Sequence, residues 1–368
     1  MASFTKRGKT WQYTVSRRIN GKSKPIRKGG FKTKKEAQVA AAEVEESLRK
    51  GLVPYLRLEP FDKYFEEWID LYKKDVSRVT IKRYKDTLRT IQEYFGHKPI
   101  QDISKRDYQA FLNEYGQTRA KETTRKLNNH IRACVRDAID EGIIRVDFTR
   151  GATITGHVEA KRPEEKHLNY EESKVLLNEL YNRLDRALAY YLLLLGLTSG
   201  MRYAEMVGLT RKDFDFKNNV INVDKTWDYK TGDGFAKTKT DLSNRKIKMD
   251  ARTMAAFKNL FNEMPSNIHG LVFFNPGSKS KVITNNNANK MLERMLKKFK
   301  IEPITIHGLR HTHASVLLYQ KVSIYYVSER LGHSTIDTTM RHYAHVIKEL
   351  REEDTKAAIS TFENMRVV

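Results

Sequence analysis

The sequence predicts a mainly α-helical protein with small β-sheets, an α+β chain of several modules. Apolar residues recur at helical spacing through most of the chain, a few short stretches alternate apolar and polar residues, and Gly- or Pro-containing segments separate these patterns. Of 368 residues, 39% are hydrophobic and 31% are charged, a balance typical of a folded globular protein. The longest apolar run, Ala187–Leu195, is much shorter than the ~20 residues of a membrane-spanning helix, so we expect no membrane partner.

The beginning of the chain has no apolar segment of the kind found in secretory leaders. There is a single cysteine, Cys134, which excludes an internal disulfide and any cysteine-cluster metal site. We therefore expect a cytoplasmic protein in a reducing compartment.

The charge is strongly basic and unevenly distributed. Lys and Arg number 68 against 45 Asp and Glu, a net charge of +23, and about half of this excess lies in residues 1–57. Aromatic residues such as Trp11 and Tyr13 are interleaved with the basic ones there. Such an excess favours binding to a polyanion, nucleic acid in particular. A solubility device or a membrane-surface patch are the alternatives.

Residues 1–57 are expected to form a three-stranded sheet followed by a helix. Residues 11–16 alternate with period two, Asn20-Gly21 is a favoured hairpin turn, and Gly29-Gly30 marks a second break. A basic sheet of this kind favours contact with DNA over a purely structural role.

The helix of this first module has a clear start signal. Thr33 and Glu36 have the spacing of a capping box. The helix is expected over 37–48, and Gly51 is a plausible C-cap.

A short linker at 52–57 is expected to precede a bundle of four amphipathic helices within residues 58–150. Their apolar stripes run over 61–72, 81–95, 108–115 and 127–139. Cys134 lies on the last stripe and is interpreted as a core residue. The outer faces carry a surplus of basic residues, which favours a DNA-facing bundle over an ordinary solvated surface.

Residues 151–168 lack periodicity and are expected to link the bundle to a third, mixed and mostly helical module. Asn169 and Glu172 are spaced to begin a helix. A buried helix is expected through Leu195, with strands at 220–223 and 245–249.

Three segments of the third module combine basic and titratable residues. In the first, Arg202 lies three residues before Glu205, which taken alone favours an ordinary ion pair. The second, residues 237–249, is a basic turn entering a strand. The third begins at His307 and Arg310, which share a helix face.

The third segment continues to His333 and Tyr343. Gly332 is expected to end one helix and Ser334 to cap the next, which places His333 at the corner between them. Tyr343 then lies near the end of the second helix.

The histidines of this segment have two other interpretations. His307 and His311 have zinc-ligand spacing, but the Glu of an HExxH motif and a nearby cysteine are both missing. Six histidines between residues 307 and 345, mixed with arginines, are too polar for a core. We therefore expect neither a metal nor another cofactor.

Together these segments resemble the conserved boxes of the tyrosine recombinases, in their phage-type integrase branch. The segments that carry the resemblance are Ser199-Gly-Met-Arg202 with Glu205, Lys239-Thr, His307-Gly-Leu-Arg310-His-Thr-His-Ala, Leu331-Gly-His333 and Tyr343. Each box alone is weak evidence, but all five in this order and spacing form a specific signal. The two preceding modules are similar to the arm-binding and core-binding domains of integrases, so the resemblance covers nearly the whole chain.

The resemblance implies a role for each matching residue. Tyr343 would attack the scissile phosphate, forming a 3′-phosphotyrosine and releasing a 5′-hydroxyl. Arg202 and Arg310 would bind the non-bridging oxygens. Lys239 would protonate the leaving 5′-oxygen, and Lys237 is a poorer match for that role.

The remaining roles concern histidines and one carboxylate. His307 would assist proton transfer at the tyrosine, and His333 would hydrogen-bond the phosphate. Glu205 would orient a helix or an arginine. The histidines expected only to pack around the site are His311, His313, His342 and His345. Neither ATP nor a metal ion would be required.

The implied domains are an arm-type DNA-binding domain at 1–57, a helical SAM-like core-binding domain at 58–150, a linker at 151–168, a catalytic domain at 169–345 and a C-terminal tail at 346–368. The residues expected to contact DNA are basic and lie in the first two domains: Arg17, Arg18, Lys22, Lys24, Arg27, Lys28, Lys82, Arg83, Arg125 and Lys126.

The implied function is that of a site-specific integrase. It would act as a homotetramer on double-stranded attachment sites of core and arm type, through a Holliday junction, to integrate and excise a phage or other mobile element in a bacterial chromosome. An excisionase and a host DNA-bending protein are candidate partners. The alternatives are an integrase of a conjugative transposon, a type IB topoisomerase and a non-catalytic DNA-binding protein.

The tail after Tyr343 is expected to form a helix around 348–358. Ile359, Phe362 and Met365 are spaced to bury one face. That face would dock either on its own catalytic domain or on a neighbouring protomer.

Overall fold

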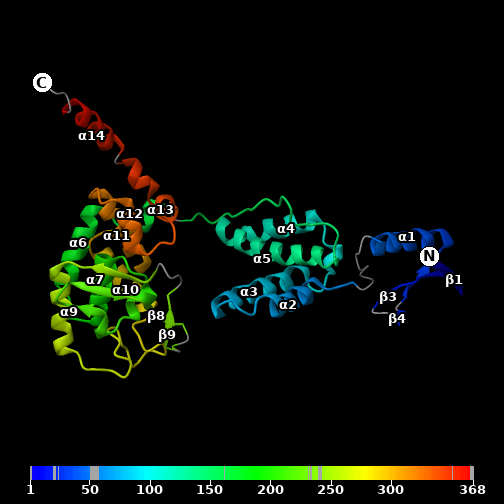
Figure 1. The fold of residues 1–368 in the computed structure, drawn as a ribbon, viewed down its shortest axis with the longest axis horizontal. Helices are drawn as coiled ribbons and strands as arrows, with labels where there is room; N and C mark the ends of the chain where they lie inside the picture. The colour runs from blue at the N-terminus through cyan, green and yellow to red at the C-terminus, as the bar shows by residue number, and fades with distance from the viewer. Residues whose placement is uncertain are drawn as a thin grey trace. The chain divides into compact units, whose positions relative to one another are not determined.

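The computed structural model describes residues 2–19, 22–23, 25–49, 58–160, 162–230, 232, 234–238, 243–349 and 351–364 (Figure 1). The chain divides into two compact units, residues 1–160 and 161–368. The division falls inside the segment 151–168 that the sequence predicts as a linker. Among the helices of the described ranges, none combines the length and apolar character needed to cross a bilayer.

The first unit begins with an antiparallel sheet of strand order β1-β2-β5, made of β1 (Ala2–Arg7), β2 (Thr10–Val15) and β5 (Ile26–Phe31). Helix α1 (Lys34–Arg49) packs against it. Tyr13, Val15 and Ile26 of the sheet form a small core with Ala41 and Val44 of the helix. The predicted sheet followed by a helix is confirmed.

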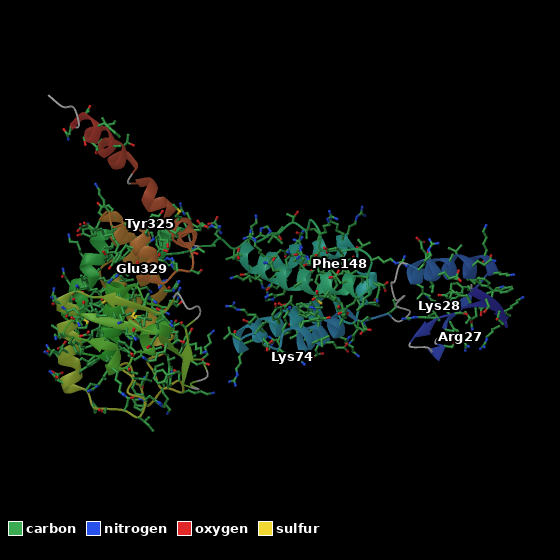
Figure 2. The ribbon with its side chains drawn as sticks, viewed as in Figure 1. Arg27, Lys28, Lys74, Phe148, Tyr325 and Glu329 are labelled. Atoms are coloured by element: carbon green, nitrogen blue, oxygen red, sulfur yellow. The ribbon has the colours of Figure 1, made fainter. Side chains whose placement is uncertain are left out.

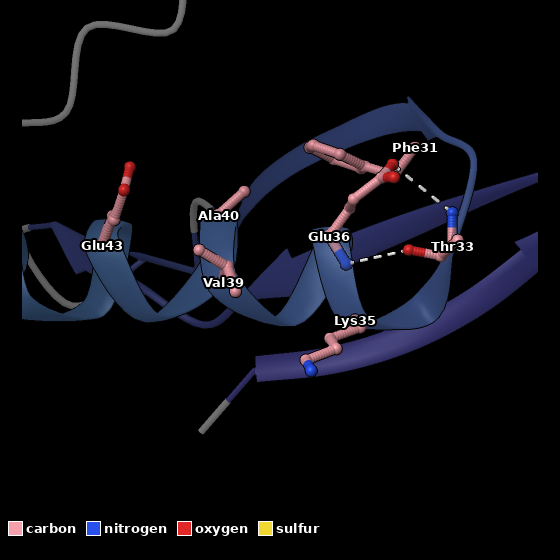
Figure 3. Close-up of a pocket in the computed structure, with 7 residues that line it drawn as sticks. All are labelled: Phe31, Thr33, Lys35, Glu36, Val39, Ala40 and Glu43. Carbon is pink, nitrogen blue, oxygen red and sulfur yellow. Dashed lines mark hydrogen bonds between the residues drawn. The ribbon is translucent and has the colours of Figure 1, made fainter.

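The predicted capping box begins helix α1, as Figure 3 shows. The Glu36 amide donates to Thr33 Oγ1 at 3.2 Å. The Glu36 carboxylate accepts from the backbone N–H groups of Lys32 at 3.0 Å and Thr33 at 3.4 Å. These bonds satisfy amides that have no partner inside the helix.

A two-stranded ribbon, β3 (Arg18–Ile19) and β4 (Lys22–Ser23), lies between β2 and β5 in the sequence. The predicted turn Asn20-Gly21, Gly51 and the linker 52–57 fall outside the described ranges.

The prediction that Gly29-Gly30 breaks the sheet is wrong, because both glycines lie within β5. Gly30 has φ +92°, and the pairing of β5 with β2 shifts in register between Tyr13 and Trp11. The glycines therefore accommodate an irregularity in a continuing strand.

The rest of the first unit contains the four predicted helices. Their bounds are α2 (Phe61–Tyr72), α3 (Arg78–Phe95), α4 (Lys105–Gly116) and α5 (Lys121–Asp140), with a 3₁₀ turn η1 (Ile100–Asp102) between α3 and α4. Helix α3 begins three residues before the predicted stripe because Ser77 caps it through the Thr80 amide. The apolar stripes meet in one core, in which Phe65, Ile131 and Cys134 are fully buried.

Hydrogen bonds between polar side chains fix α2 to α5. Trp68 Nε1 donates to Asp137 Oδ2 at 2.6 Å. The hydroxyls of Tyr64 and Tyr72 both donate to the Glu141 carboxylate, at 3.0 and 2.8 Å. Both acidic residues lie at the end of α5, so this end of the bundle is held by directional bonds as well as by apolar packing.

Residues 151–158 follow the surface of the bundle. The Thr155 hydroxyl donates to Leu112 O at 3.2 Å, and Val158 bridges to Ala120. A Cβ on Gly156 would lie 2.1 Å from the Lys121 backbone nitrogen, so only glycine permits this close approach.

The second unit is built around helix α7 (Leu188–Ser199). Its sequence is apolar on every side, so it is stable only when surrounded by other elements. Helices α6 (Tyr170–Tyr181), α8 (Tyr203–Val207), α9 (Ala251–Glu263), α10 (Asn285–Lys298) and α11 (Ile306–Tyr319) pack against it. The predicted start of α6 is confirmed: Asn169 Oδ1 accepts from the Glu172 amide, and the Glu172 carboxylate accepts from the Asn169 amide, both at 2.9 Å.

The β-structure of this unit is small. A sheet of order β10-β7-β6 contains β6 (Phe214–Asp215), β7 (Val220–Val223) and β10 (Arg245–Lys248), and β8 (Lys225–Trp227) pairs with β9 (Phe235–Lys237). Short 3₁₀ turns are η2 (Pro163–Lys166) and η3 (Arg211–Asp213). The strands predicted at 220–223 and 245–249 are confirmed, whereas β6, β8 and β9 were not predicted.

The unit ends with α12 (Ile324–Leu331), α13 (Ile336–Glu349) and α14 (Arg351–Asn364). Gly332 ends α12 as predicted, with φ +67°. Helix α13 begins at Ile336, so Thr335 rather than Ser334 immediately precedes it. The helix predicted around 348–358 is confirmed: α13 continues to Glu349, and α14 covers residues 351–364.

The apolar residues expected on one face of the tail lie on and beyond α14. Ile359 and Phe362 are exposed, at 55% and 73%. Met365 falls outside the described ranges.

Candidate active site

The site begins where the central helix α7 ends. Gly200 follows α7 with φ +68° and ψ 16°, a left-handed conformation that favours glycine. A Cβ at this position would lie 2.6 Å from the ring of His313 and 2.8 Å from the Leu331 side chain. The tight turn directs the Gly200 carbonyl and the following Arg202 toward α11 and α12.

Arg202 caps helix α8 and pairs with Glu205, as its spacing predicts. Its backbone N–H donates to Glu205 Oε2 at 2.9 Å and its guanidinium to Oε1 at 2.8 Å. The guanidinium also donates to the Gly332 carbonyl at 3.1 Å. Its side chain is 31% exposed, so this arginine retains access to a ligand.

Glu205 also binds a second arginine, Arg245, which is not among the predicted site residues. Arg245 donates to Glu205 Oε2 at 2.9 Å and to the carbonyls of Arg330 at 2.7 Å and Ser243 at 2.8 Å. Burial alone would raise the pKa of Glu205, but the charges and hydrogen bonds of Arg245 and Arg202 outweigh it, and the pKa lies below its ordinary value. Glu205 is therefore a buried carboxylate between two guanidinium groups.

Arg310 is almost completely buried, at 3% exposure. Its guanidinium donates to the carbonyls of Gly200 and Leu331, both at 2.8 Å. Burial, together with the nearby charge of Arg202, lowers the pKa of Arg310 to about 9. It remains charged at neutral pH, and the repulsion from Arg202 makes this region favourable for an anion.

Tyr343 reaches the same region from helix α13. The helix is kinked at this residue, with φ −119° and ψ 15°, and Tyr343 is 2% exposed. Its hydroxyl lies 2.9 Å from His311 Nδ1. Burial raises the pKa of Tyr343, and the charge of Arg310 opposes that rise without cancelling it.

The two other predicted histidines lie at the edge of this region. His307 is exposed on α11, and its ring stands edge-on to that of His311 with centroids 5.0 Å apart. His333 follows Gly332 at the predicted corner, and its Nδ1 lies 2.7 Å from Thr339 Oγ1. Thr339 belongs to α13, the helix of Tyr343.

Buried His313 and half-buried Arg330 form a pair that the sequence did not indicate. His313 Nδ1 donates to the Leu197 carbonyl at 2.8 Å, and its Nε2 accepts from Arg330 Nε at 3.0 Å. Burial and the charge of Arg330 lower the pKa of His313 to about 3, so the ring is neutral. Arg330 also donates to the carbonyls of Lys248 and Thr198, which ties α12 to β10 and to the end of α7.

Several predicted site residues lie outside the part of the chain that the structure describes, either entirely or in their side chains. Lys239 and Lys24 fall outside the described ranges, and of Arg18, Lys22, His342 and His345 only the backbone is described. Lys237, the weaker alternative to Lys239, is exposed on β9.

The predicted DNA-contacting residues of the first unit that are described lie at its surface. Arg27 and Lys28 are exposed on β5 (Figure 2), and Arg17 is half-buried. Four further predicted contacts are exposed on α3 and α5: Lys82, Arg83, Arg125 and Lys126. Within the ranges that the structure describes, no three His, Cys, Asp or Glu residues are placed to hold a metal ion.

Replacing Gly200 by alanine should disturb the site. The substitution forces alanine into a left-handed conformation and its Cβ against His313 and Leu331. We expect the free energy of unfolding to fall by about 2–4 kcal/mol and any activity of the site to fall by at least roughly tenfold through displacement of the Gly200 carbonyl that holds Arg310. Chemical denaturation and an activity assay would measure both effects.

Gly270→Ala is the matched control, because Gly270 has φ +64° and open space around its Cβ position. That variant should lose only about 1–2 kcal/mol, the cost of a left-handed alanine. Equal losses in the two variants would show that contact with His313 and Leu331 is unimportant.

Comparisons with known proteins agree with this arrangement. Residues 166–349 match the Phage integrase family, residues 3–48 an Arm DNA-binding domain, and residues 60–115 the Phage integrase N-terminal SAM-like domain. A "Tyrosine recombinase XerC-like" protein of Caldanaerobacter subterraneus is 27% identical, over 94% of this chain and 95% of the relative. The integrase of Staphylococcus phage L54a is 25% identical, over 84% of this chain and 95% of the relative.

Among solved structures, the chain is similar to the Tn1549 transposon integrase in complex with a circular intermediate DNA. The TM-score is 0.67 at 23% identity, covering 81% of this chain and 99% of the other. The family match includes Arg202, Arg310 and Tyr343 and spans half of the sequence. The chain belongs to the phage integrase family of tyrosine recombinases.

Proposed function

We propose that this integrase cuts and rejoins DNA through a phosphotyrosine formed at Tyr343, with the scissile phosphate bound by Arg202 and Arg310. The proposal rests on the observation that these three residues lie in the same region of the second unit. Arg202 and Arg310 donate to the adjacent carbonyls of Gly332 and Leu331, and the Tyr343 hydroxyl lies 2.9 Å from Nδ1 of His311, the residue that follows Arg310.

The chemistry follows from these groups. Tyr343 Oη attacks phosphorus, the Oη–P bond forms and the P–O5′ bond breaks, and the 5′-oxygen leaves as a hydroxyl after taking a proton. Arg202 and Arg310 stabilise the charge on the non-bridging oxygens as it builds up in the transition state. By its resemblance to the family, Lys239 supplies the proton and His333 hydrogen-bonds the phosphate.

The phosphotyrosine keeps the energy of the broken phosphodiester bond, since one phosphodiester replaces another. Rejoining is attack by a 5′-hydroxyl on the same phosphorus, with Tyr343 as leaving group. The proposed cycle therefore uses no ATP, and two guanidinium groups and a lysine supply the positive charge that a metal ion could otherwise provide.

The proposed substrate is double-stranded DNA in the bacterial cytoplasm. The exposed basic residues on β5, α3 and α5 would contact the phosphate backbone and contribute mainly affinity and salt dependence. The proposed layout assigns residues 1–57 to arm sites, 58–150 to core sites, 151–168 to a linker and 169–345 to catalysis. The similar Tn1549 transposon integrase is in complex with DNA in its solved structure, which supports DNA as the proposed substrate.

The proposed assembly is a homotetramer that brings two duplexes together and exchanges strands through a Holliday junction. The element integrated is a phage genome or a conjugative transposon, since proteins of both kinds are among the relatives and structural neighbours. An excisionase and a host DNA-bending protein are the proposed partners in excision. The tail helix α14, with its exposed Ile359 and Phe362, would dock on its own domain or on a neighbouring protomer.

The test is a cleavage assay on nicked suicide duplexes made from the ends of the element, in the presence of EDTA. Wild type is expected to form a covalent protein–DNA adduct, and Tyr343→Phe is expected to bind the same duplex without forming it. Tyr319→Phe is the matched control, because Tyr319 is exposed at the end of α11. Adduct formation by Tyr343→Phe, or binding without adduct by wild type, would contradict the proposal.

A further inference from the structure

We propose that His311 accepts the Tyr343 hydroxyl proton during DNA cleavage and returns it during rejoining. This inference rests on the proposed function. It assigns proton transfer to a residue that the sequence analysis expected only to pack around the site, in place of His307. The contact that carries it joins His311 Nδ1 and Tyr343 Oη, 2.9 Å apart.

Two packed helices hold this contact. Helix α11 packs against both α7 and α13, and its residues on either side of His311, Arg310 and Thr312, are buried. Tyr343 is buried on α13 at the kink in that helix. The distance is that of a well-formed hydrogen bond, and the geometry already satisfies the requirement that a base lie within reach of the proton it removes.

The environment of Tyr343 creates the need for a base. Burial raises the pKa of Tyr343 in spite of the opposing charge of Arg310, so the resting nucleophile is the neutral phenol. A neutral phenol is a weak nucleophile unless its proton is removed as it attacks. Arg202 and Arg310 cannot accept that proton, because a guanidinium group has no acceptor.

The charged and titratable groups around His311 fit this role. His307 lies one turn earlier on the same helix, with its ring edge-on to His311 at 5.0 Å. Arg310 is the adjacent residue, and its guanidinium is turned to the carbonyls of Gly200 and Leu331. His311 is itself only half-buried, so a proton on the ring has access to solvent.

In the proposed step one proton moves from the tyrosine oxygen to the histidine nitrogen. Neutral His311, with its hydrogen on Nε2, accepts the Oη proton at Nδ1 as the Oη–P bond forms and the P–O5′ bond breaks. The product is an imidazolium next to the phosphotyrosine. In rejoining, a 5′-hydroxyl attacks phosphorus, the Oη–P bond breaks, and the imidazolium returns the proton to Oη.

The experiment measures single-turnover cleavage of the suicide duplex by full-length wild type, His311→Gln and His307→Gln. Glutamine keeps hydrogen-bonding ability but cannot carry the proton. His311→Gln is expected to cleave roughly 10²–10⁴-fold more slowly than wild type with unchanged DNA affinity, and His307→Gln is expected to lose less. His311→Asn is the second variant, and circular dichroism confirms that each variant is folded.

Fluorotyrosine at position 343 separates proton transfer from positioning. A trifluorotyrosine ionises near neutral pH and needs no base, so it should restore most of the cleavage lost in His311→Gln and add little to wild type. Trifluorotyrosine at position 343 should not restore cleavage in the Lys239→Ala variant. A DNA substrate with a 5′-bridging phosphorothioate has a leaving group that needs no proton, so it should restore cleavage in Lys239→Ala but not in His311→Gln.

Two results would overturn the inference. One is a wild-type rate in His311→Gln, and the other is a slow His311→Gln that fluorotyrosine does not restore, which would make His311 a positioning residue only. A wild type that binds DNA but forms no adduct would instead contradict the proposed function itself. The two failures are therefore distinguishable in the same set of reactions.

Discussion

Arg310→Met is expected to abolish most cleavage activity while leaving the protein about as stable as wild type. The arginine is 3% exposed, and burial with the charge of Arg202 lowers its pKa from 12.5 to about 9. Keeping that charge out of water therefore makes Arg310 costly in the folded state. Because the folded-state pKa of a cation is lowered, this cost is fully present below pH ~9.

Methionine removes that cost, but it also removes two hydrogen bonds. The carbonyls of Gly200 and Leu331 lose the donor that Arg310 supplies, at about 1–3 kcal/mol each. The two effects nearly cancel, so the free energy of unfolding should change by less than about 2 kcal/mol. Cleavage should nevertheless fall by roughly 10³-fold or more, since the charge that stabilises the transition state is gone.

Thermal unfolding with and without inorganic phosphate would test, in the absence of DNA, whether Arg310 binds an anion. An anion bound by Arg202 and Arg310 should stabilise wild type by about 2.7 kcal/mol at a hundred times its dissociation constant, and Arg310→Met should lose most of this gain. Arg211→Met is the control, because Arg211 lies on η3, donates to the Met264 carbonyl and packs over Phe261 of α9. A loss of more than about 4 kcal/mol in Arg310→Met would show that the arginine is structural.

The helices could be predicted because their sequences carry a strong period. Helix α2 buries Phe61, Phe65 and Trp68 at the spacing seen in the sequence, and Thr33 and Asn169 begin helices as their capping boxes predict. Strands β6, β8 and β9 contain only two or three residues each. Such strands are too short to show alternation, and tertiary pairing alone defines them.

The contacts of the site could be predicted from the sequence only in part. The sequence places His307 and His311 on one face of a helix, because they are four residues apart. Which of them meets Tyr343 depends on the packing of α13 against α11 and on the kink at Tyr343, neither of which has a local signal. The same holds for Arg245 and Arg330, whose partners Glu205 and His313 lie far away in the sequence.

Glu205→Gln is expected to have the largest effect on stability. Glu205 is 2% exposed and binds both Arg202, at 2.8 Å, and Arg245, at 2.9 Å. Glutamine keeps the shape but leaves Arg245, itself 6% exposed, without its counter-charge. Breaking a buried ion pair on one side costs about 3–5 kcal/mol, and the loss should appear in urea denaturation at pH 7. Cleavage should also fall, because Arg202 is no longer held in place.

The pH dependence of this loss distinguishes the ion pairs from simple packing. The pKa of Glu205 is below its ordinary value in the folded protein, so its contribution to stability is fully present above the unfolded-state pKa, about 4.3. It is lost as pH falls through the lower folded-state pKa. The difference in stability between wild type and Glu205→Gln should therefore be constant from pH 7 to pH ~5 and shrink in more acidic solution.

Glu329→Gln, at an exposed position on α12, changes the net charge equally and should leave stability within about 0.5 kcal/mol of wild type. A difference for Glu205→Gln that persists unchanged at low pH would mean that the carboxylate charge is not what holds Arg202 and Arg245.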